Sequence, residues 1–399
     1  MAITNSIKTV NLALQGGGAH GAFAWGVLDR LIEDGRLQID GLTATSAGSM
    51  NASVYAYGKM MGGPDGAREA LHNFWYNISK TGKLYSPMKY MPWEMPSLNG
   101  WNIESSLSFL LFETWTRLFS PYQFNPFNFN PLREVLSESV DFEKLVMCKC
   151  TNLFISATKV RTGQVRVFRN EEITLDVILA SACLPYLFQA VEIDGEHYWD
   201  GGYMGNPALH PLFYHTQSRD VVILHINPMY QENIPTKAPE ITDRINEITF
   251  NSSLLKELRA IAFVTKLLEE GWLKDEYRSR LKHVFVHSIH ADGALGDLTL
   301  ASKFNCDWNF LTELRDRGRQ TAEQWLDQNF EHIGKRATVD LRKEYIGESS
   351  LGKSTRRGSV RDEEAFLQMQ SGIASQSKTR KPAAPSQSGK RNALAANAS

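Results

Sequence analysis

The sequence has few cysteines and no long apolar run. Its four cysteines, Cys148, Cys150, Cys183 and Cys306, are too few and too scattered for a disulfide scaffold, and the first two lack the spacing of a zinc site. We therefore expect a reducing, cytoplasmic compartment. No window of about 18 uncharged apolar residues occurs. The apolar run near the N-terminus is too short for a signal peptide, so neither a transmembrane helix nor a secretory leader is predicted.

Net charge is also nearly absent, since 43 Lys and Arg residues face 44 Asp and Glu residues among 399. The balance is uneven, because residues 351–399 hold nine basic residues against three acidic ones. The rest of the chain is therefore acidic, which argues against nucleic-acid binding. With 42% hydrophobic and 11% aromatic residues, the chain has ample material for a large core.

The pattern of apolar residues, glycines and prolines predicts an α/β protein. Strand, turn and helix alternate over residues 8–230, with the first strands expected at 9–14 and 37–45 and the first helix at 19–33. Residues 231–345 are expected to be mainly helical. A stripe of apolar residues over 241–272 suits either the core or subunit packing, so a homo-oligomer stays open. Residues 346–399 are expected to form a disordered basic tail.

An aromatic and proline-rich insertion interrupts this alternation at residues 74–129, where 15 aromatic residues occur. Regular structure is expected mainly at 103–119, as an amphipathic helix with Leu107, Leu111, Trp115 and Leu118 on one side. Two interpretations remain open. The segment is either a lid or acyl-chain groove in peripheral contact with a membrane, or an excursion whose aromatic residues pack on the domain.

Three consecutive glycines, Gly16, Gly17 and Gly18, follow the first predicted strand and precede a helix. Such a turn leaves backbone N–H groups uncovered at a helix N-terminus, where negative charge is favoured. Gly16, Gly18 and Gly21 also satisfy the G-x-G-x-x-G pattern of dinucleotide-binding folds, and Asp40 follows about twenty residues later. The turn therefore suits an oxyanion or a phosphate, or is purely structural.

A second turn places Ser46 between a β-rich segment and a helix of small residues, followed by Gly48. This is the layout of a nucleophile elbow, in which a sharp strand-to-helix turn exposes the serine oxygen. The alternative is that Ser46 merely caps the helix. Ser49 is the other candidate nucleophile, but it lacks glycine framing.

Asp200 ends a predicted hairpin strand and precedes Gly201 and Gly202. Two glycines let another backbone segment or a substrate approach the carboxylate closely. A buried carboxylate with a raised pKa can accept a proton from a serine hydroxyl.

Together these motifs resemble the patatin-like phospholipase family. The resemblance rests on residues 16–21, 45–49 and 200–202 with Asn206-Pro207, and covers about residues 8–230. It implies a three-layer α/β/α sandwich and a Ser–Asp dyad without histidine, with Ser46 as nucleophile and Asp200 as base. It also implies an oxyanion hole at Gly16, Gly17 and Gly18, supported by Gly48, Gly201 and Gly202.

Two positions depart from the family pattern. Ala44 stands where the elbow has its first glycine, and His20 stands where the glycine loop has Arg or Lys. We hypothesise that His20 supports the oxyanion loop with a charge that depends on pH near neutrality. The alternative is a surface or capping histidine. A Ser–His–Asp triad also stays open, because several histidines follow Asp200, among them His210, His215, His225, His283, His287 and His290.

The sequence thus predicts a serine acyl hydrolase that cleaves lipid esters in lipid degradation, with no metal or organic cofactor. An acyltransferase or thioesterase on the same dyad, a nucleotide-binding Rossmann-type protein and a catalytically silent membrane module are the alternatives.

Overall fold

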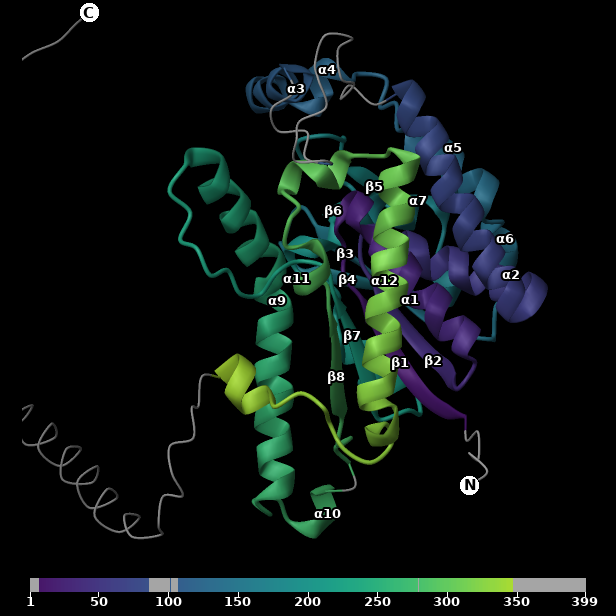
Figure 1. Cartoon of the computed structure of the whole chain (residues 1–399), viewed down its shortest axis with the longest axis vertical. Helices are drawn as coiled ribbons and strands as arrows, with labels where there is room; N and C mark the ends of the chain where they lie inside the picture. Colours follow the sequence, from purple (N-terminus) through teal and green to yellow (C-terminus); the bar gives the residue numbers. More distant parts are fainter. Residues whose placement is uncertain (1–6, 86–100, 102–106, 279, 347–399) are drawn as a thin grey trace, which may run out of the picture. The chain divides into compact units, whose positions relative to one another are not determined.

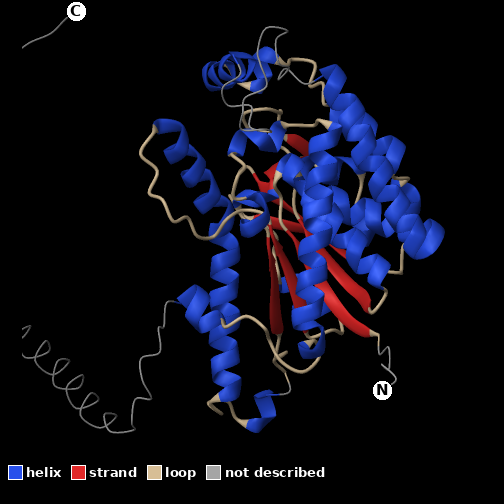
Figure 2. Ribbon diagram, viewed as in Figure 1, coloured by secondary structure: helices blue, strands red, loops and turns tan. Residues whose placement is uncertain are grey.

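A mixed β-sheet lies at the centre of the fold, with helices packed on both of its faces (Figures 1 and 2). The structure is a computed structural model that describes residues 7–85, 101, 107–278 and 280–346. Apart from residue 346, the predicted tail lies outside the described residues, as does the start of the helix predicted at 103–119. The described residues form the predicted three-layer α/β/α arrangement with a mainly helical C-terminal part.

The described strands form one eight-stranded sheet. They are β1 (Lys8–Leu14), β2 (Leu37–Ala44), β3 (Asn152–Lys159), β4 (Val165–Arg169), β5 (Val191–Ile193), β6 (Glu196–Asp200), β7 (Asp220–His225) and β8 (Phe285–His290). Their order is β5-β6-β3-β2-β1-β7-β8, and β4 pairs with β3. The pairs β3–β2, β2–β1, β1–β7 and β7–β8 are parallel, whereas β4 and β6 run antiparallel to β3. The turns that follow β1, β2 and β7 therefore meet at one edge of the sheet.

Twelve described helices accompany the sheet. They are α1 (Gly21–Asp34), α2 (Ala47–Tyr85), α3 (Leu107–Leu118), α4 (Pro121–Phe124), α5 (Pro131–Ser139), α6 (Phe142–Leu145), α7 (Leu175–Ser181), α8 (His210–His215), α9 (Ala238–Glu269), α10 (Asp275–Arg278), α11 (Asp292–Leu295) and α12 (Trp308–Asn329). Short 3-10 turns η1 (Gly18–His20), η3 (Gly201–Tyr203) and η4 (Leu300–Phe304) also border the site described below.

Successive residues of the central strands point to opposite faces of the sheet and enter two separate cores. In β7, Val222 and Leu224 join the core formed with α1, α2, α5, α7 and α12, whereas Val221 and Ile223 join the core formed with α8 and α9. Because both faces of the central strands are buried, the sequences of these strands are nearly continuous apolar runs.

The helix after Ser46 differs from the sequence prediction, whereas the apolar stripe at 241–272 agrees with its core interpretation. The helix after Ser46 continues to Tyr85, well into the aromatic stretch, and bends at Gly62 and Gly63, where Gly63 has a φ of 65°. The apolar stripe predicted at 241–272 lies on α9, and Leu254, Leu258 and Ile261 belong to the core under it. The stripe therefore packs within the chain. Among the described residues, no helix combines the length and the hydrophobicity needed to cross a bilayer.

Candidate active site

Ser46 occupies a sharp turn between β2 and α2. Its φ is 54°, one of the few positive values outside glycine among the described residues. A helix-capping serine normally has extended backbone, so this conformation is that of an elbow. Both neighbours of Ser46 in the chain are buried, but Ser46 itself is only half-buried. The turn is fixed by a hydrogen bond of 2.9 Å from the Ser46 amide to Ser181 Oγ.

Gly48 lets the start of α2 approach the end of β1. A Cβ atom at this position would lie 2.5 Å from Leu14 O and 2.8 Å from Gln15 O, both rigid backbone atoms. Ala44, which replaces the first glycine of the elbow pattern, is the last residue of β2 and is fully buried. The turn therefore accommodates its methyl group.

The sheet register brings Asp200 to the level of Ser46. Ala44 in β2 pairs with Ile155 in β3, and Ala157, two residues further along β3, pairs with Asp200. Ser46 is likewise two residues beyond Ala44, so the serine and the carboxylate arrive at the same height of the sheet from opposite sides of β3.

The Asp200 carboxylate is completely buried. Its Oδ1 atom accepts a hydrogen bond of 2.7 Å from the Gly202 amide, while Oδ2 has no hydrogen-bond partner of good geometry among the described residues. Burial raises the pKa of Asp200 to about 7, against the opposing effects of the Gly202 amide and the nearby Ser46 hydroxyl. A carboxylate with this pKa changes protonation near neutrality, as a general base must.

Gly201 and Gly202 both sit where a side chain would not fit. A Cβ atom on Gly201 would overlap Ser156 O, and one on Gly202 would overlap the ring of Phe250. The two glycines thus hold the backbone after Asp200 against β3 and α9.

The glycine loop after β1 lies directly beside Ser46. A Cβ atom on Gly16 would lie 2.6 Å from Ser46 Cβ and 3.4 Å from Ser46 Oγ, and one on Gly17 would lie 2.5 Å from Ile226. Gly18 has a φ of 56°, and a Cβ atom there would meet Lys303 O at 2.5 Å. The loop therefore needs a glycine at each of the three positions, because a side chain would collide with a different neighbour at each one.

The loop amides are not equivalent as donors. The Gly16 amide already donates to Asn206 Oδ1 at 2.8 Å, which leaves it unavailable to a ligand and differs from the sequence prediction. Among the described residues, the amides of Gly17 and Gly18 donate to no acceptor. These two N–H groups are the donors that remain for an oxyanion.

His20 lies under the loop, and the expectation that its charge varies near neutral pH is wrong. The side chain is buried, with Nε2 2.7 Å from Ser302 Oγ, and the Ser302 hydroxyl itself donates to Thr299 O. Nε2 is therefore the donor. Burial, with a further contribution from the charge of Lys303, holds the pKa of His20 well below its usual value. His20 is a neutral buried residue that supports the loop through Ser302.

Polar residues that the sequence analysis did not single out hold the loop in place. Gln15 Oε1 accepts from the amides of Ile226 and Asn227 at 2.9 and 3.0 Å, and Asn227 Nδ2 donates to Gly16 O at 2.9 Å. A lone glutamine or asparagine carries no signature in a single sequence. Asn206, which accepts from the Gly16 amide, differs from these residues because it belongs to one of the sequence motifs.

Among the described residues, neither the dinucleotide-binding site with Asp40 nor a Ser–His–Asp triad is assembled. Asp40 lies beside Val10 and Asn11 in the β1–β2 register, several residues before the glycine loop, and its carboxylate accepts from the amides of Gln217 and Ser218. Among the described residues, no histidine after Asp200 hydrogen-bonds to Ser46 or Asp200. His287 instead bonds to Asp220, and His225 to Ser288.

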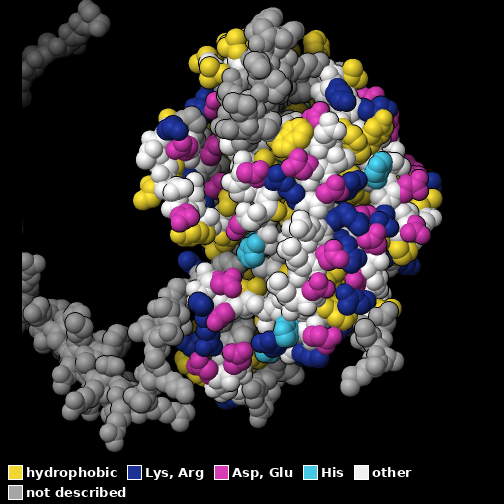
Figure 3. All heavy atoms as spheres, in the orientation of Figure 1, with side chains coloured by type: hydrophobic (Ala, Val, Ile, Leu, Met, Phe, Trp, Pro, Cys, Tyr) yellow, Lys and Arg dark blue, Asp and Glu magenta, His cyan; other side chains and the backbone are white. Residues whose placement is uncertain are grey.

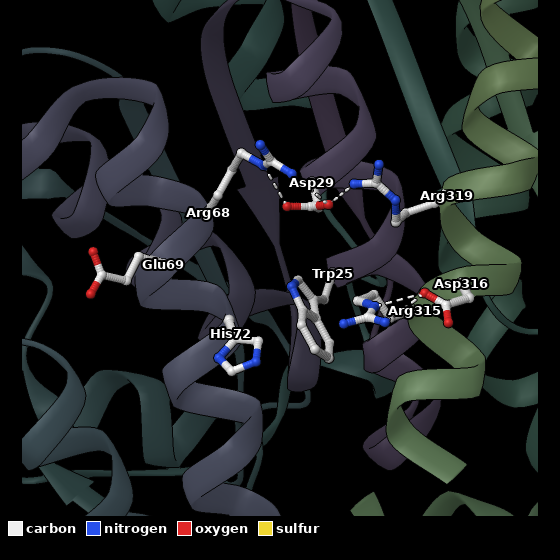
Figure 4. Close-up of a pocket in the computed structure, with 8 residues that line it drawn as sticks. All are labelled: Trp25, Asp29, Arg68, Glu69, His72, Arg315, Asp316 and Arg319. Atoms are coloured by element: carbon white, nitrogen blue, oxygen red, sulfur yellow. Dashed lines mark hydrogen bonds and ion pairs between the residues drawn. The ribbon is translucent and has the colours of Figure 1, made fainter. Parts of the chain in front are cut away.

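A cavity of about 330 Å³ lies elsewhere, between α1, α2 and α12 (Figure 4). Arg68 and Arg319 both pair there with Asp29, and Arg315 pairs with Asp316 beside Trp25. The cations are thus matched by carboxylates. This arrangement stabilises the helix packing and is separate from Ser46.

The chain is similar to a known protein family and to solved structures. The sequence matches the model of the patatin-like phospholipase family over residues 12–213, just over half of the chain. No curated protein matches it. Among solved structures, VipD from Legionella pneumophila is similar with 14% identity and a TM-score of 0.37, covering 93% of this chain and 77% of that one. The type III effector protein ExoU is similar with 17% identity and a TM-score of 0.29, covering 81% and 53%.

Proposed function

The chain belongs to the patatin-like phospholipase family, and we propose that it cleaves the acyl esters of lipids with Ser46 as nucleophile and Asp200 as base. The proximity of the Ser46 hydroxyl to a buried carboxylate whose pKa is about 7 carries this proposal. The positive φ of Ser46 supports it, since that conformation presents the hydroxyl at the edge of the sheet.

The reaction begins when the Asp200 carboxylate accepts the Ser46 proton and Ser46 Oγ attacks the ester carbonyl carbon. The carbonyl oxygen becomes an oxyanion, which the free amides of Gly17 and Gly18 bind. Each such donor typically contributes about a hundredfold or more to the rate. The tetrahedral intermediate collapses to an acyl-enzyme, and protonated Asp200 returns its proton to the departing alcohol.

Water completes the cycle. Asp200 accepts a proton from the water molecule, whose oxygen attacks the acyl-enzyme, and the fatty acid leaves as Ser46 recovers its proton. One carboxylate thus serves both halves of the reaction. The low dielectric around Asp200 that raises its pKa also strengthens the interactions of the loop amides.

Contact with a membrane surface forms part of the proposal, and α3 is its basis. No described side chain of this helix is buried, and Leu107, Leu110, Leu111, Trp115 and Leu118 are 49–70% exposed. Apolar side chains are visible at the surface around α3 in Figure 3. An exposed apolar cluster of this kind marks an interaction surface. A lipid hydrolase needs such a surface to meet its substrate.

Hydrogen bonds connect this segment to the site. Tyr122 Oη, in α4, accepts from the Ala190 amide at 3.2 Å, and Gln189 Nε2 donates to Asn125 O at 2.8 Å. The same loop contains Cys183, whose carbonyl accepts from the Asp200 amide at 2.8 Å. The segment that follows α3 is therefore connected through this loop to the backbone of Asp200.

Phospholipid turnover by the purified protein tests the proposal. Wild type is expected to release free fatty acid, while Ser46→Ala and Asp200→Asn lose at least about a thousandfold in kcat. Ser137→Ala, on an exposed part of α5, serves as the matched serine control and retains activity. Wild-type rates in either dyad variant would contradict the assignment. Adding an acceptor alcohol separates hydrolysis from acyl transfer, since transfer yields an acylated alcohol in place of fatty acid.

A further inference from the structure

A segment outside the residues that match the family model packs against the glycine loop. η4 follows β8 and packs against η1, the turn that contains Gly18 and His20. Lys303 O approaches Gly18 so closely that a Cβ atom there would lie 2.5 Å from it, and Ser302 Oγ bonds to His20. This contact joins residues nearly three hundred positions apart, and Ser302 and Lys303 lie outside residues 12–213, which match the family model.

The Lys303 side chain also reaches the loop through one intermediate residue. Its Nζ donates to Asn227 Oδ1 at 2.7 Å, and Asn227 is only 1% exposed. The amide end of Asn227 donates to Gly16 O at 2.9 Å. Because the ammonium has no acceptor lone pair, it fixes the orientation of the Asn227 amide, with its oxygen toward Lys303 and its nitrogen toward the loop.

We propose that Lys303 is a positioning residue for the oxyanion loop, which it orients through Asn227 and supplies with a positive charge behind the Gly17 and Gly18 amides. The inference rests on the proposed function, because it concerns the oxyanion of that reaction. The charge favours the transition state over the uncharged ester, so it acts on kcat more than on substrate binding.

The surroundings of Lys303 set the pH range in which it is charged. Burial lowers the pKa of its ammonium to about 8, while Asp243 and Glu247 on α9 act in the opposite direction. His20, the titratable group on the loop side, remains neutral. Lys303 is therefore charged below about pH 8 and loses its charge above that value.

Lys303→Met removes the charge while keeping most of the side-chain length, and Lys303→Arg keeps the charge. On a soluble p-nitrophenyl ester, Lys303→Met is expected to lower kcat by about ten- to a hundredfold with KM changed less than about threefold. Lys303→Arg should recover most of the loss. Lys256→Met, which removes an exposed lysine from α9, is the matched control and keeps wild-type kcat.

The pH profile separates an electrostatic role from a merely structural one. Wild type should lose activity above about pH 8, Lys303→Arg should retain it to higher pH, and Lys303→Met should lack this alkaline decline. Wild-type kcat in Lys303→Met, or an unchanged alkaline decline, would overturn the inference. If Ser46→Ala remained active, the proposed function itself would fail, whereas an inactive Ser46→Ala beside a normal Lys303→Met would refute only the role of Lys303.

Discussion

The Asn206 side chain accepts a hydrogen bond from the Gly16 amide at 2.8 Å. This bond ties the segment after the Asp200 strand to the loop after β1, so the proposed base and the proposed oxyanion donors are mutually positioned by a contact across 190 residues. Because the Gly16 amide already donates to Asn206, it is not available to donate to an oxyanion. The loop is thus held from both sides, by Asn206 at its amide and by Asn227 at its carbonyl.

Asn206→Ala is expected to weaken both the fold and the reaction. The Gly16 amide would lose its buried partner, which costs about 1–3 kcal/mol of unfolding free energy. The loosened loop should lower kcat by about tenfold. Chemical denaturation and ester turnover measure the two effects. Asn11→Ala truncates an equally buried asparagine that bonds to Ser218 O, and it should cost stability but spare kcat. Equal kcat losses in both variants would show that Asn206 has no specific role.

The rise of activity with pH should follow Asp200. Its pKa of about 7 means that the carboxylate is protonated and unable to accept the Ser46 proton at lower pH, so kcat/KM should increase through about pH 7. His20 remains neutral throughout this range, and His20→Gln should leave the position of the rise unchanged even if the rate falls modestly. A shift of the rise by more than about half a pH unit in that variant would assign the titration to His20.

Folding stability should report the same carboxylate. The folded-state pKa of Asp200 is raised from 3.8 to about 7, so ionisation destabilises the folded state, most strongly above pH 7 and progressively less as pH falls toward 4. Asp200→Asn removes this cost and should raise the unfolding free energy at pH 8 by up to about 4 kcal/mol. The gain should shrink to less than half at pH 5. Chemical denaturation at pH 8 and pH 5 measures both values. An Asp200→Asn variant less stable than wild type at pH 8 would refute the account.

The α3 surface should matter only for lipid in a bilayer. Leu111→Glu places a charge among exposed apolar residues, and it should reduce binding to phosphatidylcholine vesicles and the hydrolysis of their lipids by about tenfold. Turnover of a soluble ester should remain unchanged. Ser137→Glu adds the same charge to the exposed surface of α5 and should leave both activities intact. Equal losses on both substrates would instead indicate that α3 helps to fold the site.

The sequence was informative where a local pattern has one physical solution. The alternation of β1, α1 and β2 followed from the periodicity of the apolar residues. The elbow and the Asp-Gly-Gly turn stood out because glycines are placed where side chains would collide with backbone atoms, as Gly48 and Gly201 show.

Residues that act through long-range packing could not be found in this way. Asn227 and Lys303 meet the loop only in three dimensions, and each has an ordinary local sequence. The error at His20 has the same cause. Its neighbours in the chain do not reveal that Ser302 and Phe310 enclose the ring, and this burial is what keeps it neutral.

Labelling with a serine-directed fluorophosphonate, followed by peptide mapping, tests the central claim most directly. The account predicts a single modified serine, Ser46, with labelling slowed at least about a hundredfold in Asp200→Asn because the hydroxyl then lacks its base. Modification of Ser49 or Ser181 in place of Ser46, or undiminished labelling without the Asp200 carboxylate, would contradict it.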